Sequence, residues 1–310
     1  MPRAPIINVI GEQDRIRRKL IKSIQKQIGG KLITYTVNRN ISPNFIDHND
    51  IRFFNDLLES CGDVDRLILM INSPGGELDA AEKIAMMCRA YCKEFFVLVP
   101  ESAKSAATMI ALTADKILMG YLSSLGPIDP QIRVVSPKGG FHYIPAYSYI
   151  SSFRALINEI IRGTPPKAII PSLQLIDPAL IDVCFKAIES SKQFAIKWLS
   201  KYMLKGNVVK AKKIAEELSN LDRWLSHGKN IDRDTAANLG LTIEKIPKDS
   251  KLWKQIWELF CRQEIKMNAT NIVKHYECDK HSTGITIHTK GAPSQVPSSS
   301  GGLPSPSVAP

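Results

Sequence analysis

Two neighbouring glycines and a serine have the types and spacing that acyl-transfer chemistry needs. Gly75 and Gly76 follow the apolar run Leu67–Ile71, which has the composition of a buried strand. Without Cβ atoms, the chain there can expose free backbone N–H groups, which is half of an oxyanion hole. Ser105 follows a second apolar run, Phe95–Val99, and opens the segment SAATMIALTA. Its hydroxyl would lie at a helix N-terminus, where the dipole favours developing negative charge, so the pattern predicts a serine nucleophile.

The elements that would position these residues alternate between strand and helix. A third apolar run, Ile117–Met119, follows the Ser105 segment, and helix-like segments separate the three runs. Upstream, Lys31–Val37 is a strand candidate and Asp47–Glu59 is a helix with a core-facing apolar stripe. This order predicts an α/β fold.

Three motifs, in order, carry a resemblance to a known family. SPGG, AKSAATMIALTADKI and SLGPIDPQI resemble the serine dehydrogenase proteinases, which are Clp-fold serine peptidases related to ClpP and SppA and, more distantly, to the crotonases. The match covers about residues 30–245. It implies a Clp/crotonase-like superhelix of repeated β-β-α units with a protruding handle helix. It also implies a serine-type peptidase that hydrolyses a peptide or protein substrate without ATP, a cofactor or a metal.

The resemblance assigns roles to individual residues. Ser105 would be the nucleophile, and Gly75, Gly76 and Ala106 would form the oxyanion hole. Replacing Gly76 by Val should then keep the fold and abolish turnover. No His lies between Ser105 and His142, and Asp129 occupies the place where Clp relatives carry their catalytic His. His227, in the closing motif WLSHGKNIDRDTAANLGL, aligns with a His of the family and is the predicted general base, with Asp129 orienting its ring.

Lysine is the alternative base, as in the Ser-Lys dyads of SppA peptidases. Lys192 falls on the apolar stripe of its predicted helix, where burial would lower its pKa. Lys138 is a further candidate because it lies nearer in sequence to where SppA enzymes place their lysine. Asp129 has a plainer interpretation as a turn residue before Pro130.

Two functions other than proteolysis stay open. A crotonase-like acyl-CoA enzyme would need an acidic acid/base pair, for which Glu77, Asp79 and Glu101 are placed. A catalytically inactive Clp-fold scaffold is favoured by Ala107, which stands where a Gly normally follows Ser-Ala in the family.

Composition limits the partners. Lys and Arg number 41 against 30 Asp and Glu, a net charge of +11, but the basic clusters lack interleaved aromatic residues and are typical of solvated helix faces. We therefore predict no nucleic-acid partner. No apolar run reaches the ~20 residues of a transmembrane helix, and the N-terminus lacks a secretion signal, so we expect a cytoplasmic protein. The cluster His275, Cys278, His281 and His288 is too irregular to predict a metal site.

The chain divides into four predicted parts. Residues 1–30 are a basic amphipathic helix, 31–250 the Clp/crotonase-fold peptidase domain, 251–290 a C-terminal helix and extension, and 291–310 a disordered Ser/Pro/Gly tail. Within the domain, residues 132–176 read as a loop-and-helix insertion. Asp177 and Pro178 cap a helix that runs to about Leu204. This helix resembles the handle that makes subunit contacts in Clp relatives, so we expect a homo-oligomer.

Overall fold

A mixed sheet forms the centre of the computed structural model, which describes residues 5–135 and 139–286. Within these residues it has seven strands, in the spatial order β10-β5-β3-β2-β1-β11-β12. The first five are parallel to one another. β11 pairs antiparallel with β1, and β12 pairs antiparallel with β11. The strands are β1 (Lys31–Val37), β2 (Val64–Asn72), β3 (Cys92–Val99), β5 (Lys116–Met119), β10 (Ile243–Lys245), β11 (Ile272–Cys278) and β12 (Ser282–Thr286).

The sheet is buried on both faces, and alternate residues of its strands supply two cores. Leu69 and Ile71 of β2 join the cluster under α2 (Asp50–Cys61), α3 (Leu78–Ala90) and α4 (Ala106–Leu112). Ile68 and Met70 point to the other face, where α1 (Pro5–Ile28) and α11 (Lys251–Ala269) cover the sheet. Because side chains alternate along a strand, a nearly continuous apolar run serves both layers, as expected for parallel strands.

Short strands form a second sheet beside the first and complete the predicted repeats. β4 (Ser102–Ala103) pairs with β6 (Ser124–Leu125), and β6 pairs with β9 (Ile231–Asp232). Ser73 bridges to Ala103, so β2, β3 and β5 are each followed by a residue or strand of this second layer. Helix α3 follows Ser73, and helix α4 follows β4. The arrangement confirms the predicted α/β fold of β-β-α units.

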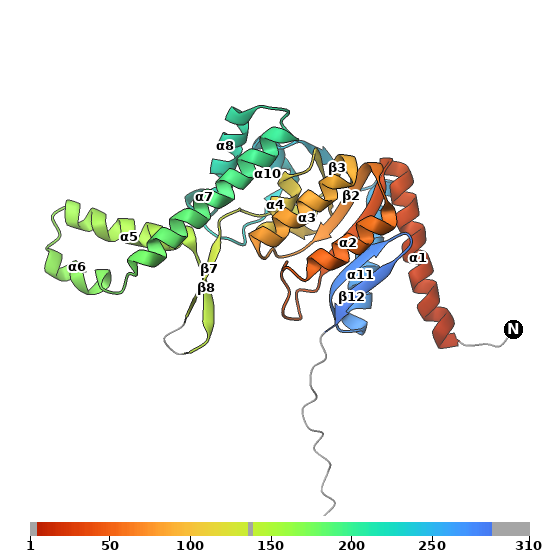
Figure 1. The fold of residues 1–310 in the computed structure, drawn as a ribbon, viewed down its shortest axis with the longest axis horizontal. Coiled ribbons are helices and arrows are strands. Elements are labelled where there is room, and N and C mark those ends of the chain that lie inside the picture. The colour runs from red at the N-terminus through yellow and green to blue at the C-terminus, as the bar shows by residue number, and fades with distance from the viewer. Residues whose placement is uncertain (1–4, 136–138, 287–310) are drawn as a thin grey trace, which may run out of the picture.

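A helical projection leaves the body next to a hairpin, β7 (Gln131–Val135) and β8 (Phe141–Pro145). Helices α5 (Ala146–Ile161) and α6 (Pro166–Leu173) and the first half of α7 (Pro178–Lys201) extend away from the sheet (Figure 1). Asp177 caps α7 as predicted, because its Oδ1 accepts a hydrogen bond from Ala179 N at 2.8 Å. The chain returns to the body through α8 (Val208–Ser219), α9 (Leu221–Trp224) and α10 (Arg233–Asn238). α7 is therefore the protruding handle helix that the sequence predicted.

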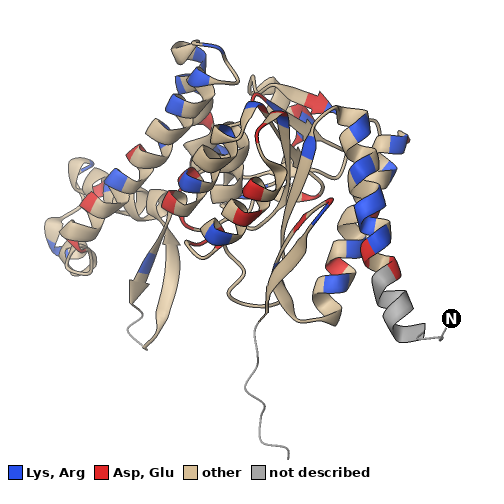
Figure 2. Ribbon diagram, turned by 45° about the vertical axis from the view of Figure 1, so that its right-hand side comes forward, with Lys and Arg blue, Asp and Glu red and all other residues tan. Residues whose placement is uncertain are grey.

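Helix α1 is amphipathic and basic, as predicted, although it begins at Pro5. Leu20, Ile21 and Ile24 are buried against the sheet and α11. Lys and Arg residues recur along the helix (Figure 2), and the exposed ones are Arg15, Arg18, Lys19, Lys22 and Lys26. Among the described residues no single helix is both long and apolar enough to cross a bilayer; α6 and α7 together pass that test but meet at a bend of 72°.

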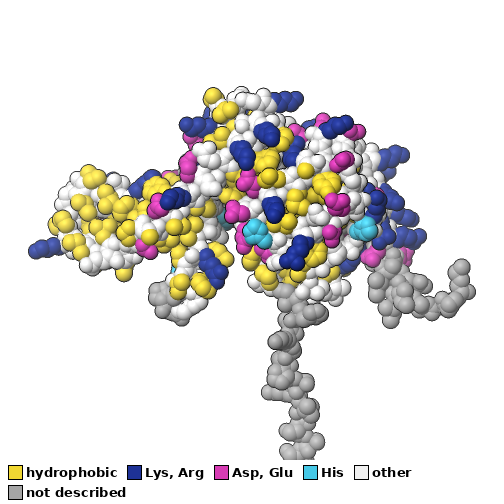
Figure 3. Space-filling view, viewed as in Figure 1, with side chains coloured by type: hydrophobic (Ala, Val, Ile, Leu, Met, Phe, Trp, Pro, Cys, Tyr) yellow, Lys and Arg dark blue, Asp and Glu magenta, His cyan; other side chains and the backbone are white. Residues whose placement is uncertain are grey.

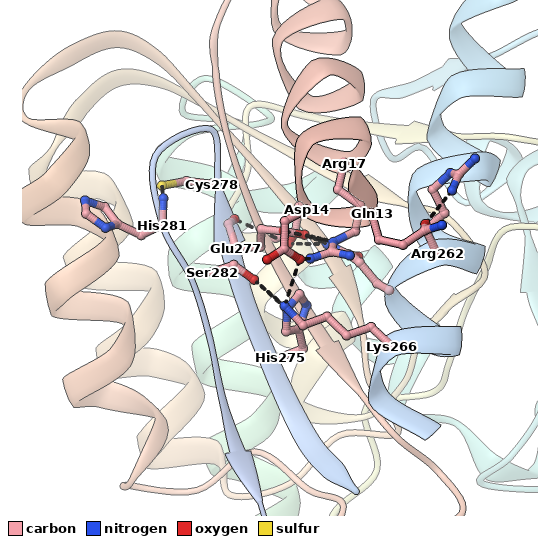
Figure 4. A network of polar contacts seen from close by, with 12 residues as sticks. Gln13, Asp14, Arg17, Arg262, Lys266, His275, Glu277, Cys278, His281 and Ser282 are labelled. Atoms are coloured by element: carbon pink, nitrogen blue, oxygen red, sulfur yellow. Dashed lines mark hydrogen bonds and ion pairs between the residues drawn. The ribbon is translucent and has the colours of Figure 1, made fainter. Parts of the chain in front are cut away.

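A buried polar network fixes α1 to the rest of the fold (Figure 4). Arg17 Nε donates to Glu277 Oε1 at 2.9 Å, and both side chains are almost fully buried. Gln263 of α11 donates to the other carboxylate oxygen of Glu277 at 2.9 Å. His275 lies beside this pair, with Nε2 3.0 Å from Ser282 Oγ. Burial, together with the charges of Lys266 and Arg17, lowers the pKa of His275 to about 3, so the buried ring is neutral at physiological pH.

Candidate active site

Ser105 occupies a strained turn between β4 and α4. Its backbone has φ 49° and ψ −119°, values that residues with a Cβ rarely adopt and that cost about 1–3 kcal/mol. The hydroxyl makes no capping hydrogen bond to α4, although Ser105 is the N-cap residue. The turn therefore presents the side chain away from the helix that follows it. Ala106 is the first residue of α4, a position whose N–H has no partner within the helix.

The glycine turn lies directly against Ser105. Gly75 has φ 112°, and a Cβ built on it would be 2.6 Å from Ser105 Cβ. Gly75 N donates to Ser73 Oγ at 3.2 Å. Gly76 has φ 153°, and its N–H donates to no protein acceptor within the described part of the chain. Of the two glycine amides, that of Gly76 is thus the one left to bind another group.

Gly76 also has a structural role that the sequence did not reveal. A Cβ at this position would lie 2.1 Å from Ile46 O and 2.4 Å from Ile46 N. Ile46 is bound on both sides, since its N–H donates to Gly75 O at 2.7 Å and its carbonyl accepts from Glu77 N at 2.8 Å. Replacing Gly76 by Val would force this backbone apart, so the expectation that the fold survives that substitution is wrong.

His227 and Asp129 are in hydrogen-bond contact, although they come from two segments far apart in sequence. His227 Nδ1 is 2.9 Å from Asp129 Oδ1. The Asp129 side chain is 1% exposed and that of His227 19%, so the carboxylate is buried and the ring reaches the surface. When Asp129 accepts a hydrogen bond from Nδ1–H, the imidazole is held in the tautomer whose Nε2 is free to take a proton. Pairing of β6 with β9 brings the two segments together, because one precedes Asp129 and the other follows His227.

All six residues predicted for nucleophile, base, orienting acid and oxyanion hole line one cavity. Its volume is about 830 Å³, and its wall includes Ser105, Ala106, Gly75, Gly76, Asp129 and His227. The rest of the wall includes residues of the hairpin and of α7 and apolar residues such as Met109 and Ile128. Ala107 is fully buried in the core beneath α4 and does not line this cavity. The methyl group that replaces the usual glycine hydrogen is therefore directed away from the site.

The described residues considered for alternative mechanisms either lie outside the Ser105 cavity or line it without the partner that their mechanism requires. Lys192 lines a different cavity, of about 630 Å³, between α5, α7 and α8. Lys138 lies outside the described residues. Of the acidic residues considered for crotonase chemistry, Glu77 lines the Ser105 cavity, whereas Asp79 and Glu101 do not. Within the described residues no group of three or more His, Cys, Asp or Glu side chains could hold a metal ion, and His288 lies outside them.

The hairpin residues of the cavity wall were not predicted. Ile132 and Arg133 of β7 and Tyr143 of β8 line the cavity, in a region that the sequence indicated only as part of an insertion. Gly139, Gly140 and Pro145 concealed the strands, because they break the alternating pattern within a few residues. The alternation of Ile132 and Val134 with the polar Gln131 and Arg133 was the available signal, and it is only a few residues long.

Comparison with known proteins agrees with the motifs. The model of the ClpP-like SDH-type serine proteinases matches residues 10–141. This part of the chain is similar to that family. The match confirms the resemblance predicted from the motifs, and it contains the glycine turn, Ser105 and Asp129. His227 lies beyond the matched residues, so its place in the site comes from its contact with Asp129.

The chain is similar to two uncharacterized proteins of Methanocaldococcus jannaschii. Uncharacterized protein MJ0137 is 31% identical over 196 residues, which are 63% of this chain and 59% of the relative. Uncharacterized protein MJ1495 is 28% identical over 214 residues, 66% of this chain and 64% of the relative. The chain thus spans less than two thirds of the length of either relative.

Solved structures with a similar chain path include a mutant of the 1510-N membrane-bound stomatin-specific protease. It has 18% identity and a TM-score of 0.41, over 68% of this chain and 79% of that one. A probable enoyl-CoA hydratase/isomerase of Mycobacterium abscessus has 12% identity and a TM-score of 0.35, over 75% of this chain and 72% of that one.

Proposed function

We propose that the protein is a serine peptidase that cleaves peptide bonds through an acyl-enzyme on Ser105. The observation that carries the proposal is the His227–Asp129 pair, 2.9 Å apart, on the same cavity as the strained Ser105 and the glycine turn. A serine hydroxyl is a weak nucleophile until a base takes its proton and donors stabilise the oxyanion. Both kinds of group line this cavity.

In the proposed reaction Ser105 Oγ attacks the carbonyl carbon of the substrate while His227 Nε2 takes the hydroxyl proton. The N–H groups of Gly76 and Ala106 bind the oxyanion, and Gly75 gives Ser105 the space to stand next to them. The tetrahedral intermediate collapses, the C–N bond breaks, and His227 gives its proton to the leaving amine. Water, deprotonated by His227, then releases the acyl group and restores Ser105.

The first experiment identifies the nucleophile. A fluorophosphonate should label the wild-type protein on the peptide containing Ser105, and the label should be absent in Ser105→Ala. Ser190→Ala is the matched control, because Ser190 lines the same cavity from α7 and should not affect labelling. Labelling that persists in Ser105→Ala, or that disappears in Ser190→Ala alone, would contradict the assignment. Hydrolysis of a peptide ester without nucleotide tests the predicted independence from ATP.

We further propose that the projection makes contacts between subunits. Its described surface carries exposed apolar side chains, and Figure 3 shows hydrophobic residues gathered over the α5–α6 end. Examples are Ile161, Leu175 and Phe185. Exposed apolar patches of this kind mark interaction sites. Sedimentation should report an oligomer that Leu175→Glu weakens, and a monomer at micromolar concentration would refute the proposal. The cytoplasmic location stays a prediction.

A further inference from the structure

The side chain of Lys104, the residue before the candidate nucleophile, joins the two segments that carry His227 and Asp129. Its Nζ donates to Leu125 O at 2.8 Å, which lies at the end of β6 and shortly before Asp129. It also donates to Lys229 O at 3.0 Å and to Asn230 Oδ1 at 2.7 Å, both just after His227. One ammonium group therefore holds three oxygens from the two loops.

The backbone of Lys104 connects the same point to the glycine turn. Lys104 N donates to Ser73 O at 3.0 Å, two residues before Gly75. Lys104 O accepts from Ala107 N at 2.8 Å and closes the first turn of α4. Lys104 is thus bound to all four parts of the site: the nucleophile turn, the glycine turn, the Asp129 segment and the His227 segment.

The geometry makes this lysine a support and not a base. A protonated lysine has three N–H donors and no acceptor, and the three donors match the three oxygens. Lys104 does not line the Ser105 cavity. Gly126 supplies the space for the lysine stem, because a Cβ there would be 2.8 Å from Lys104 Cδ.

We propose that Lys104 is a positioning residue that keeps the His227–Asp129 pair aligned with Ser105. The inference rests on the proposed function, since alignment matters only if His227 acts on Ser105. Misplacement of a catalytic group by about 1 Å can reduce a rate about 10²-fold, so a contact that fixes both loops has a measurable effect.

Titration of Lys104 gives the inference a second, independent signature. Burial and the charge of Arg39 lower the pKa of Lys104 to about 8. The three oxygens that Lys104 Nζ contacts are two carbonyls and a side-chain amide, and none is a carboxylate that would offset the repulsion from Arg39. Loss of the proton leaves two N–H donors for three oxygens, so one loop contact weakens as the pH rises through 8. We therefore expect activity to fall there.

The test uses Lys104→Met, which keeps the length of the stem and removes every donor. Lys229→Met is the matched control, because it removes an equal charge from the same loop while Lys104 binds only the Lys229 carbonyl. We expect Lys104→Met to reduce kcat, and the rate of fluorophosphonate labelling at Ser105, by about 10–100-fold with KM nearly unchanged. The decline above pH 8 should also be absent from the Lys104→Met profile. Lys229→Met should match the wild type in all three measurements.

Asn230→Ala removes one of the three acceptors of Lys104, and it replaces Lys104→Met as the test variant if Lys104→Met does not fold. It should lower kcat several-fold, and adding it to Lys104→Met should cause little further loss. The inference is overturned if a folded Lys104→Met, or Asn230→Ala, retains wild-type kcat, or if KM rises instead. The proposed function fails separately, if the wild-type Ser105 is not labelled at all.

Discussion

Replacing Gly75 by Ala should displace the nucleophile Ser105 and leave His227 and Asp129 unchanged. The new Cβ would be 2.6 Å from Ser105 Cβ and 2.8 Å from Lys104 O, whereas ordinary contacts lie at 3.4–4 Å. Ser105 must therefore retreat by roughly 0.8 Å, or the glycine turn must move by as much. The φ of 112° adds backbone strain, which costs about 1–3 kcal/mol for a residue with a side chain.

A shift of this size at the reacting atom predicts a fall of about 10²-fold in the rate of Ser105 acylation. The assay is the second-order rate of fluorophosphonate labelling, followed by mass spectrometry, with the melting temperature measured on the same samples. Gly163→Ala is the matched control. Gly163 has φ 93° but no atom within 4 Å of its added Cβ, so it carries similar backbone strain without contacting the site.

Gly163→Ala should lose stability through backbone strain alone. Gly75→Ala should lose more stability, because its Cβ also clashes with Ser105 and Lys104, and it alone should lose reactivity while it stays folded. A folded Gly75→Ala protein that labels at the wild-type rate would refute the argument that this glycine positions the nucleophile. Equal loss of labelling in both variants would refute it too, because general destabilisation would then explain the effect.

The remaining predictions concern the base and the buried network. His227→Ala should reduce turnover at pH 7.5 by about 10²–10⁴-fold, while Lys192→Met should change it little. Turnover rates of the two folded variants test which residue is the base, and the reverse order would make it the lysine. Arg17→Met should destabilise the fold by about 3–5 kcal/mol in urea unfolding, because it leaves the buried carboxylate of Glu277 without its cation; a loss below 1 kcal/mol would contradict this. The pKa of His275 is lowered to about 3 in the folded state, so between about pH 6.5 and 3 the unfolded chain binds more protons than the folded one. The free energy of unfolding should therefore decrease as the pH falls through this range, by up to about 1.4 kcal/mol per pH unit. His275→Gln should flatten this slope in melting curves, and an unchanged slope would show that other groups cause it.

The sequence predicted the centre of the fold because its signals there are local. The apolar runs of β2, β3 and β5, the glycines after β2 and the serine before α4 lie within one stretch of chain. The contact between Asp129 and His227 joins residues 98 apart. It depends on the two-residue strands β6 and β9, which are too short to leave a periodic pattern. Only the family motif pointed to both residues.

Strand β11 was missed for a different physical reason. Every residue of Ile272–Cys278 is buried, yet three of them are Lys274, His275 and Glu277. A polar residue inside a sheet is tolerated when it is paired. The charged partners Asp50 of Lys274 and Arg17 of Glu277 come from α2 and α1, more than 200 residues away. Hydrophobic periodicity cannot reveal a strand whose burial depends on ion pairs. The sequence therefore predicted an irregular extension here, with scattered residues of the types that bind metals.

The backbone strain at Ser105 favours the peptidase proposal over the hypothesis of a catalytically inactive scaffold. If this position only had to begin a helix, an N-cap serine in an extended conformation would accept a hydrogen bond from α4 and carry no strain. Ser105 instead has φ 49° and ψ −119° and makes no capping bond, and its turn is supported by Lys104 and by a glycine with no room for a methyl group. Strained residues persist where surrounding contacts hold them, and they cluster at sites of chemistry. Ala107, the residue that favoured the scaffold interpretation, packs in the core and leaves the cavity open. The contacts that maintain this conformation therefore support a nucleophile at Ser105.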